Sequence, residues 1–384
     1  MRVEVEQLSA SDWEEGLSFL NGVFGEHGAH DFANLLPSIY QPTDESMANN
    51  HAVRENGSIR AVVGLFPLDW QVGDSVLKVG GIGGVSTHSS ARGKGYMKVL
   101  MTHCVEKMKA EGYHLSWLGG QRQRYGYFGY EKCGQQLSVS LGGANVRHVF
   151  GERDALRFEP LEEDDTGRLE LARQLHDGQL VHNRRGADVF QRFLVSWYHR
   201  PYAALDADGN MVGYLVTDKE GGNVTELVAT DETVAVDVAR SWVQSRSEGG
   251  ARFDIPPTRF ELLQRLSAIG EGANVGSSGN WQIYDWAATV EVLMCVRATS
   301  GGLADGEVII GIDGYGSLNI RVADARVTCE KVDAPPAVSW DAFTAMRVLF
   351  GPLPPSAVTD VPAEATALLA WCPLPLGWPR QDGV

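Results

Sequence analysis

The sequence has few cysteines and no long hydrophobic run. Its five cysteines are scattered along the chain: Cys104, Cys133, Cys295, Cys329 and Cys372. Their number is odd, and neither a CxxC pair nor an HExxH motif is present, so we expect neither a disulfide framework nor a metal site. The longest apolar runs, such as residues 292–296, are far too short to cross a bilayer. Residues 1–6 lack the apolar core and cleavage signal of a secretory peptide. We therefore expect no metal, no membrane as a partner and a cytoplasmic location.

Basic residues are also scarce. There are 33 Lys and Arg against 49 Asp and Glu, which gives a net charge of −16. This balance argues against nucleic acid as a partner, because the phosphate backbone would be repelled. It is compatible with a cationic substrate, although acidic side chains also serve solubility alone. With 384 residues, the chain exceeds the size of a single hydrophobic core, so we expect two or three domains.

A glycine-rich turn is the most informative feature that is present. A glycine-rich strand over 79–87 leads into the turn 89–96, and apolar residues at helical spacing follow the turn: Met97, Leu100, Met101, Cys104, Val105 and Met108. This spacing predicts a helix over about 94–111. Glycines let the backbone approach a ligand closely, and the start of a helix presents free N–H groups to an anion. The turn therefore predicts a phosphate-binding site.

Two other phosphate-binding turns are excluded at this position. The glycines stand too close together for a P-loop, and no Lys-Ser/Thr pair follows them. The dinucleotide fingerprint also fails, because Lys98 stands three residues after Gly95, where that fingerprint has a glycine. A strand, a glycine turn and a helix also occur together without any ligand, and this alternative stays open.

The periodicity along the first 150 residues predicts an α+β domain with a central mixed sheet. Strands are expected over 2–7, 50–55, 59–71, 74–87 and 114–118, with a helix from about residue 13, the helix 94–111, a short helix after residue 120 and two further strands to about 142. This block has strands on both sides of its main helix, which favours a layered α+β fold.

The remainder of the chain predicts two further regions. Over 155–286 we expect a strand at 156–160, helices near 166–176 and 186–198, and a hairpin across 206–210. This region has no second Arg-Gly-x-Gly turn, and Gly276–Gly279 is a loop, since it does not fit the G-x-S-x-G nucleophile motif. The segment 289–384 is expected to be rich in strands at first, with helices around 340–350 and 362–371 and a stiff, proline-rich tail at 373–379.

Arg92, Gly95 and Met97 stand at the spacing R/Q-x-x-G-x-G/A, with Met97 in place of a small residue, and Tyr125 precedes Phe128-Gly129-Tyr130. This pattern resembles the acetyl-CoA site of the GNAT superfamily of N-acetyltransferases. The three-part order of the chain resembles the enhanced intracellular survival (Eis) group. The resemblance implies a catalytic GNAT domain over 1–150, a second GNAT-like domain without a coenzyme site over 151–288, and a sterol carrier protein-like α/β domain over 289–384. It also implies a homo-oligomer, a hexamer in that group.

The resemblance assigns roles to residues of the first domain. Backbone groups around Val85 and Thr87 would bind the acetyl carbonyl and the pantetheine arm. The pyrophosphate of acetyl-CoA would lie on the turn made by Arg92, Gly93, Lys94, Gly95 and Tyr96. Tyr125 would be the general acid for the departing thiolate, although a lone tyrosine is more often a packing residue. We assign Tyr127 and Tyr130 to packing.

The base is less well defined by the sequence. In the Eis group the carboxylate at the end of the chain takes the amine proton, which places this role on Val384. An α-carboxylate has a pKa of about 3.5 and is ionised at neutral pH, so it is able to accept a proton. A frayed terminus is the alternative. Glu26 and Asp31 are expected either to bind a substrate cation or to be solvated loop charges.

The resemblance leads us to expect an acetyl-CoA-dependent N-acetyltransferase that acts on primary amines of a cationic small molecule, aminoglycoside-like in character. The amine would attack directly, since no cysteine lies in the motif. A polyamine or a protein lysine is an alternative acceptor. A non-catalytic acetyl-CoA sensor that binds a lipid or another ligand is an alternative of a different class, but mere binding would not require Tyr125.

Overall fold

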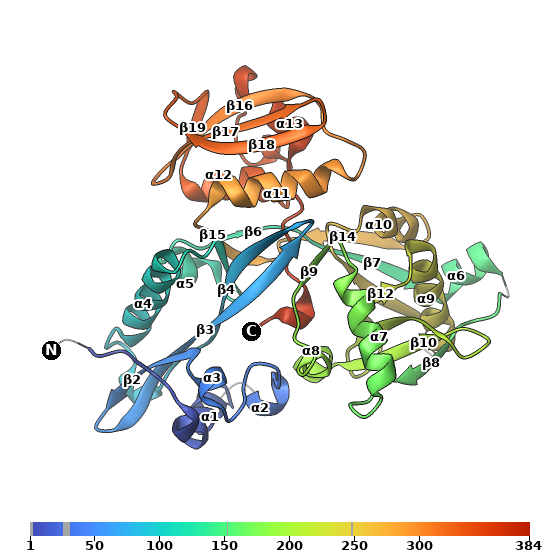
Figure 1. The fold of residues 1–384 in the computed structure, drawn as a ribbon, viewed down its shortest axis with the longest axis horizontal. Helices are drawn as coiled ribbons and strands as arrows, with labels where there is room; N and C mark the ends of the chain where they lie inside the picture. The colour runs from blue at the N-terminus through green and yellow to red at the C-terminus, as the bar shows by residue number, and fades with distance from the viewer. Residues whose placement is uncertain (1–2, 26–30, 152, 247–248) are drawn as a thin grey trace.

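The computed structural model describes residues 3–25, 31–151, 153–246 and 249–384. They form three lobes, each built on its own β-sheet, and the first two lobes lie side by side beneath the third (Figure 1). The fold is a mixed α+β fold, as the sequence predicts.

The first sheet has the order β1-β2-β3-β4-β5-β15-β6, and β9 pairs with the end of β3. Its strands are β1 (Glu6–Gln7), β2 (Asn50–Glu55), β3 (Ser58–Val72), β4 (Ser75–Thr87), β5 (Leu115–Leu118), β6 (Glu131–Cys133), β9 (Val181–Asn183) and β15 (Gly279–Ile283). The helices of this lobe are α1 (Trp13–Gly25), α2 (Phe32–Leu35), α3 (Asp44–Met47), α4 (Tyr96–Ala110) and α5 (Arg122–Gly126). The expected strands over 50–87 and the expected helix over 94–111 are confirmed.

The second sheet has the order β14-β7-β13-β12-β11-β10-β8. Its strands are β7 (Gln136–Gly142), β8 (Arg157–Pro160), β10 (Arg200–Leu205), β11 (Met211–Thr217), β12 (Asn223–Ala229), β13 (Gly250–Ile255) and β14 (Gly272–Gly276). The helices that accompany it are α6 (Gly143–Phe150), α7 (Thr166–Asp177), α8 (Phe190–Val195), α9 (Glu232–Ser245) and α10 (Phe260–Ser267). The expected hairpin across 206–210 joins β10 to β11.

The third sheet has the order β18-β17-β16-β19. It consists of β16 (Gly306–Ile312), β17 (Gly316–Ala323), β18 (Arg326–Val332) and β19 (Val338–Trp340), with the helices α11 (Trp286–Ala298), α12 (Ala342–Phe350) and α13 (Ala367–Trp371). The strands expected in this segment are confirmed as β16, β17 and β18, but the helix α11 precedes them and was not expected. Val290, Leu293 and Met294 are buried at helical spacing, and the side chain of Asp285 caps the helix by accepting from the Ala288 amide.

The first two sheets exchange strands, so the sheets do not follow the order of the chain. β7 follows β6 almost directly, yet it belongs to the second sheet, whereas β15 returns to the first sheet and lies between β5 and β6. Trp281 of β15 is fully buried opposite Trp117 of β5. Residue periodicity predicts that a strand forms but not which sheet it joins, so this exchange is a feature of the tertiary structure.

Candidate functional site

The sheet of the first lobe opens at the carboxyl end of β4. β4 and β5 pair in parallel from Val79 opposite Leu115 to Ile82 opposite Leu118, and β4 then continues alone on that side to Thr87. A bulge lies in the same stretch, because the register on β3 shifts between Val62 and Gly64. A bulge bends its strand, so the end of β4 turns away from β5 and leaves a V-shaped opening in the sheet.

The predicted phosphate-binding turn follows this opening. Gly95 has a φ of 81°, in the left-handed region that favours glycine, and it is the N-cap of α4. An added Cβ at Gly95 would meet nothing within 4 Å, so the backbone there faces open space. The helix begins with a hydrogen bond of 3.1 Å from the Val99 amide to the Gly95 carbonyl. The amides before Val99 in the first turn have no acceptor within the helix and are available to an anion.

A groove of about 960 Å³ runs from the end of β4 over this helix start. Among the residues expected to hold the coenzyme, the following line it: Val85, Thr87, Arg92, Gly93, Gly95 and Tyr96. Two cations that the sequence analysis did not identify, Lys98 and Arg124, line it as well. Lys98 lies in the first turn of the predicted helix, and from this position its contact with the phosphate groove could have been predicted. A groove with these cations and a free helix start can hold a chain of phosphates.

The Lys94 side chain is directed away from this groove. Its Nζ lies 2.8 Å from Oε1 of Glu55, at the end of β2, and the Tyr96 hydroxyl donates a hydrogen bond to the same carboxylate. The hydrogen bond from Lys94 is the main cause of the lowered pKa of Glu55. Lys94 thus contributes its backbone to the turn, while its ammonium group pairs with an exposed carboxylate.

Tyr125 lies on the short helix α5, directly after the end of β5. It is 7% exposed and belongs to the hydrophobic cluster that packs against α4. Its ring lies close to Gly120, where an added Cβ would be 2.8 Å from Cε2 of the tyrosine. Burial raises the pKa of Tyr125, an effect that the neighbouring Arg124 opposes. The phenol therefore keeps its proton at neutral pH, as a general acid must.

Val384 lies on the other face of β4. An added Cβ at Gly83 would be 2.7 Å from the carboxyl carbon of Val384, whereas one at Gly80 would meet the sulfur of Met108 in α4. The terminal group and α4 are thus on opposite faces of the same strand. The Tyr40 hydroxyl is buried beside Gly84 without a hydrogen-bond partner among the described residues, and burial raises the pKa of this phenol. The sequence analysis did not identify Tyr40, and no motif marks it.

Glu26 and Asp31 are the acidic residues expected to bind a substrate cation. Glu26 lies outside the described residues. The carboxylate of Asp31 caps α2, accepting from the Ala33 amide at 3.1 Å and from Nδ2 of Asn34 at 2.6 Å. The Asp31 carbonyl also accepts a hydrogen bond of 3.4 Å from the hydroxyl of Tyr198 in the second lobe. A substrate-binding role for Glu26 and Asp31 stays a prediction.

The described residues contain neither a metal-binding cluster nor a helix that could span a membrane. Within 3–25, 31–151, 153–246 and 249–384, no group of three or more His, Cys, Asp or Glu side chains could hold a metal ion. None of the helices in these ranges is long and apolar enough to cross a membrane.

The chain is similar to known acetyltransferases in sequence and in structure. Residues 4–133 match the model of an acetyltransferase (GNAT) domain. No match was found among curated protein sequences. Three similar solved structures cover the chain almost completely. A GCN5-related N-acetyltransferase from Kribbella flavida is 18% identical, with 98% of this chain and 97% of the other covered and a TM-score of 0.65.

The two other structures are also less than 20% identical to this chain. A GCN5-related N-acetyltransferase from Anabaena variabilis is 17% identical, with 98% of both chains covered and a TM-score of 0.65. Eis1 from Mycobacterium abscessus is 13% identical, with 97% of this chain and 99% of the other covered and a TM-score of 0.66. At these identities the likeness establishes the fold, and it extends over all three lobes.

Proposed function

Residues 4–133 form an acetyltransferase domain of the GNAT family, and from this premise we propose that the protein transfers an acetyl group from acetyl-CoA to a primary amine of a cationic small molecule. The observation that carries the proposal is the groove at the opening of the first sheet, where the end of β4 leads to the uncapped start of α4. GNAT domains use acetyl-CoA as the donor, and this groove has the features that such a donor requires.

The residues present fit acetyl-CoA. Gly95 leaves open space above the backbone, the first-turn amides of α4 face it, and Arg92, Lys98 and Arg124 line the groove. These groups would hold the pyrophosphate and the other phosphate, and the backbone of Val85 and Thr87 would hold the pantetheine arm. When bound, acetyl-CoA supplies an acetyl thioester.

We assign the two proton transfers to groups on opposite faces of β4. In the reaction a C–N bond forms as the C–S bond breaks, the amine loses a proton and the departing thiolate gains one. Tyr125 is the proposed acid, because its raised pKa keeps the phenol protonated. The carboxylate of Val384, beside Gly83, is the proposed base. A positioned acid or base contributes about 10²–10⁴-fold to the rate.

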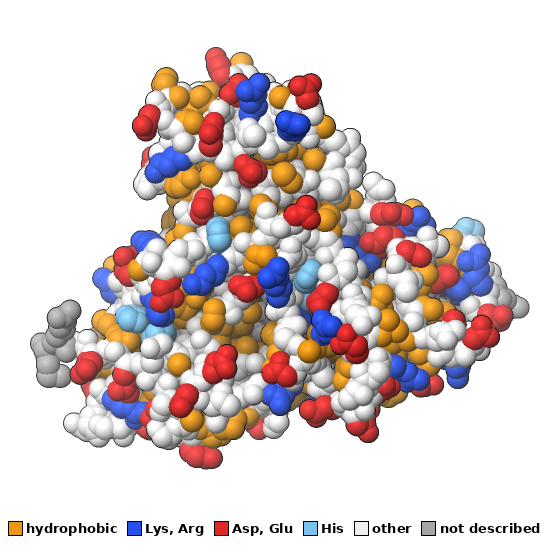
Figure 2. Space-filling model, in the orientation of Figure 1, with side chains coloured by type: hydrophobic (Ala, Val, Ile, Leu, Met, Phe, Trp, Pro, Cys, Tyr) orange, Lys and Arg blue, Asp and Glu red, His pale blue; other side chains and the backbone are white. Residues whose placement is uncertain are grey.

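A cationic acceptor is proposed from the charge of the chain. The net charge is −16, and the face drawn in Figure 2 carries acidic side chains over all three lobes, with basic side chains among them. An acidic protein raises the local concentration of a cationic substrate. An aminoglycoside-like molecule meets this requirement because it carries several primary amines. Polyamines and protein lysines are the competing acceptors.

Two further proposals follow from the resemblance to the Eis group. We propose that residues 289–384 are a sterol carrier protein-like domain, a reading supported by the four-stranded sheet β16–β19 covered by α11, α12 and α13. We also propose that the protein assembles as a homo-oligomer, as a hexamer if it follows that group. Light scattering of the purified protein would measure the assembly directly.

The function is tested by measuring thiol release from acetyl-CoA in the presence of a panel of amines. The panel contains aminoglycosides, polyamines and lysine peptides, and each product is identified by mass spectrometry. We expect release with aminoglycoside-like amines and acetylation of a primary amine. Acetyl-CoA binding without release on any amine would contradict the enzyme and favour the sensor alternative.

A further inference from the structure

The second sheet repeats the opening of the first. β12 and β13 pair in parallel only at Asn223 opposite Arg252 and Val224 opposite Phe253, and the two strands then separate. α9 follows β12 just as α4 follows β4. The second lobe therefore has the same V-shaped gap and the same helix beyond it as the coenzyme groove of the first lobe.

The helix start beyond this second gap already carries an anion. The carboxylate of Asp231 accepts hydrogen bonds from the amides of Thr233 at 2.8 Å and Val234 at 2.9 Å. These are the amides that, in α4, have no acceptor. A phosphate would have to displace a carboxylate of the chain itself, so this helix start is not a second coenzyme site.

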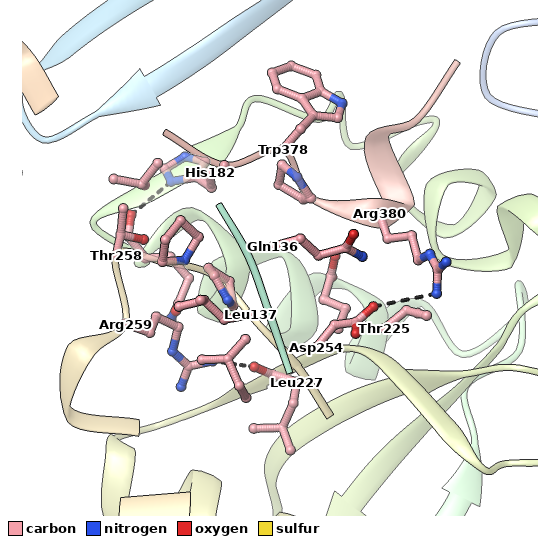
Figure 3. Close-up of a pocket in the computed structure, with 18 of the residues that line it drawn as sticks. Gln136, Leu137, His182, Thr225, Leu227, Asp254, Thr258, Arg259, Trp378 and Arg380 are labelled. Carbon is pink, nitrogen blue, oxygen red and sulfur yellow. Dashed lines mark hydrogen bonds and ion pairs between the residues drawn. The ribbon is translucent and has the colours of Figure 1, made fainter. Parts of the chain in front are cut away.

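The C-terminal segment of the chain occupies the second gap. Figure 3 shows Arg380 beside Thr225 of β12 and Asp254 of β13. Trp378 lies farther from these two residues, and its ring packs against Trp70, Trp117 and Trp281 of the first sheet. Arg380 Nη1 lies 3.5 Å from Oδ2 of Asp254. A cavity of about 90 Å³ adjoins the segment, and it is lined also by Trp70 of β3 and His176 of α7. Arg380 thus lies at the ends of the separated strands, where a pantetheine arm would have to enter.

Gln381 fixes this segment through hydrogen bonds on both ends of its amide. Its Nε2 donates to the carbonyls of Phe193 and Leu194, each at 3.0 Å, and its Oε1 accepts from the Thr225 hydroxyl at 2.9 Å. His199 Nδ1 lies 2.6 Å from the same oxygen. Gln381 is 1% exposed, so water does not compete for these bonds.

Asp382 adds a buried ion pair directly before the end of the chain. Its two carboxylate oxygens accept from Nε and Nη2 of Arg185 at 2.8 and 2.9 Å, and both side chains are 0% exposed. Glu226 of β12 holds the other side of the guanidinium at 2.7 and 3.0 Å, and Tyr214 donates to Glu226 at 2.7 Å. A buried, bidentate pair of this kind fixes direction as well as distance.

We infer that the second lobe is a clamp that holds residues 380–382 at its strand gap and so positions the carboxylate of Val384 against Gly83 of the first lobe. Val384 follows Asp382 by two residues, so the orientation of the Asp382–Arg185 pair sets where the terminal group lies. Gln381, Asp382 and Arg185 are positioning residues in this proposal. The inference rests on the proposed function, in which Val384 is the base.

The test uses the full-length protein with Asp382→Asn and, separately, Gln381→Met. Asp382→Asn keeps the shape of the side chain and removes its charge, whereas Gln381→Met keeps the ion pair and removes the amide. Hydrogen–deuterium exchange of residues 378–384 reports the clamp, and steady-state kinetics reports its effect. We expect faster exchange in this segment and kcat lowered at least about tenfold, with KM for acetyl-CoA changed by less than about twofold.

Glu159→Gln is the matched control, because it removes a carboxylate from the same lobe at a pair with Arg168, on the outer strand β8. It should leave exchange at 378–384 and kcat as they are. Unchanged exchange in both test variants would overturn the clamp, and faster exchange with unchanged kcat would overturn its positioning role. Failure of the proposed function is distinct, since the unmodified protein would then transfer no acetyl group.

Discussion

At the scale of single residues, the site depends on environments that shift protonation. The phenol of Tyr125 is buried, and burial raises its pKa above its ordinary value of 10.0. A raised pKa extends the pH range over which the phenol is protonated. Tyr125 is therefore mainly protonated at every pH below the pKa of a free tyrosine. We therefore expect the alkaline limb of kcat, where Tyr125 is the titrating group, to lie above pH 10.

Tyr125→Phe tests the acid directly. We expect kcat to fall by about tenfold or more, because the group that protonates the thiolate is lost, while the Kd of acetyl-CoA stays nearly the same. Steady-state kinetics and calorimetric binding measure the two effects. Tyr130→Phe is the control, because the Tyr130 hydroxyl is buried against Ser116 at 2.7 Å. It should cost about 1 kcal/mol of stability with kcat retained. Weakened binding with normal kcat in Tyr125→Phe would make that tyrosine structural.

Site residues could be predicted from the sequence only when they belong to a local motif. Arg92, Gly95 and Tyr125 stand in recognisable spacings, and the groove contains or adjoins all three segments. Tyr40 and Arg185 lie in no motif. Tyr40 reaches the site only because α1, α2 and β3 pack together, and Arg185 only because the tail returns to the second lobe. Such contacts join residues far apart in the chain, so local periodicity cannot predict them.

At the scale of elements, the helices α4 and α9 begin at similar places in their sheets but have different N-cap residues. α4 begins at Gly95, whose backbone faces open space, and α9 begins after Asp231, whose carboxylate takes the first amides. Both helices follow a strand that separates from its parallel neighbour. The backbone differs as well, with a φ of 81° at Gly95 and −156° at Asp231. The N-cap residue and its conformation together decide which of the two openings can receive a phosphate.

Gly95→Asp should place a carboxylate at the start of α4, where α9 has that of Asp231. We expect the Kd of acetyl-CoA to rise at least about tenfold, because the new carboxylate competes for the amides and repels the phosphates. Gly112→Asp is a matched control: Gly112 has a φ of 68° and open space around it, and it follows the other end of the same helix. It imposes similar backbone strain and the same charge, yet it should leave the Kd unchanged. Equal effects of the two substitutions would place the coenzyme elsewhere.

Elements with strong periodicity could be predicted, and their pairing could not. The strands over 50–87, the helix α4 and the hairpin of β10 and β11 are where the sequence puts them. α11 was not expected at the start of the last segment. A short apolar run such as 292–296 fits a strand or a buried helix equally well, so periodicity alone does not predict this helix. The exchange of β7 and β15 depends on which sheet edges are open after folding, and this is not a local property.

At the scale of the whole molecule, the three lobes are interlocked. β15 completes the first sheet after the chain has left it, β9 pairs with β3, and the C-terminal tail returns between the first two lobes (Figure 1). One hydrophobic cluster includes Trp70 of β3, Trp281 of β15 and Phe350 of α12. The position of the chain end at β4 is thus a consequence of the entire fold, and a docked terminus could be expected from the sequence only through the resemblance to a known family.

The proposed base can be removed from its place without altering the second lobe. In Gly83→Ala the new Cβ would lie 2.7 Å from the carboxyl carbon of Val384, closer than such atoms approach, so the terminal group must move. We expect kcat at neutral pH to fall at least about tenfold, with little change in melting temperature. Gly167→Ala, where nothing lies within 4 Å, is the control and should retain full activity.

Adding a few residues after Val384, or deleting the last four, should depress kcat in the same way. Full activity in an extended protein would exclude the Val384 carboxylate as the base, and a water relayed by Glu26 or by a backbone carbonyl would then be the preferred proton acceptor.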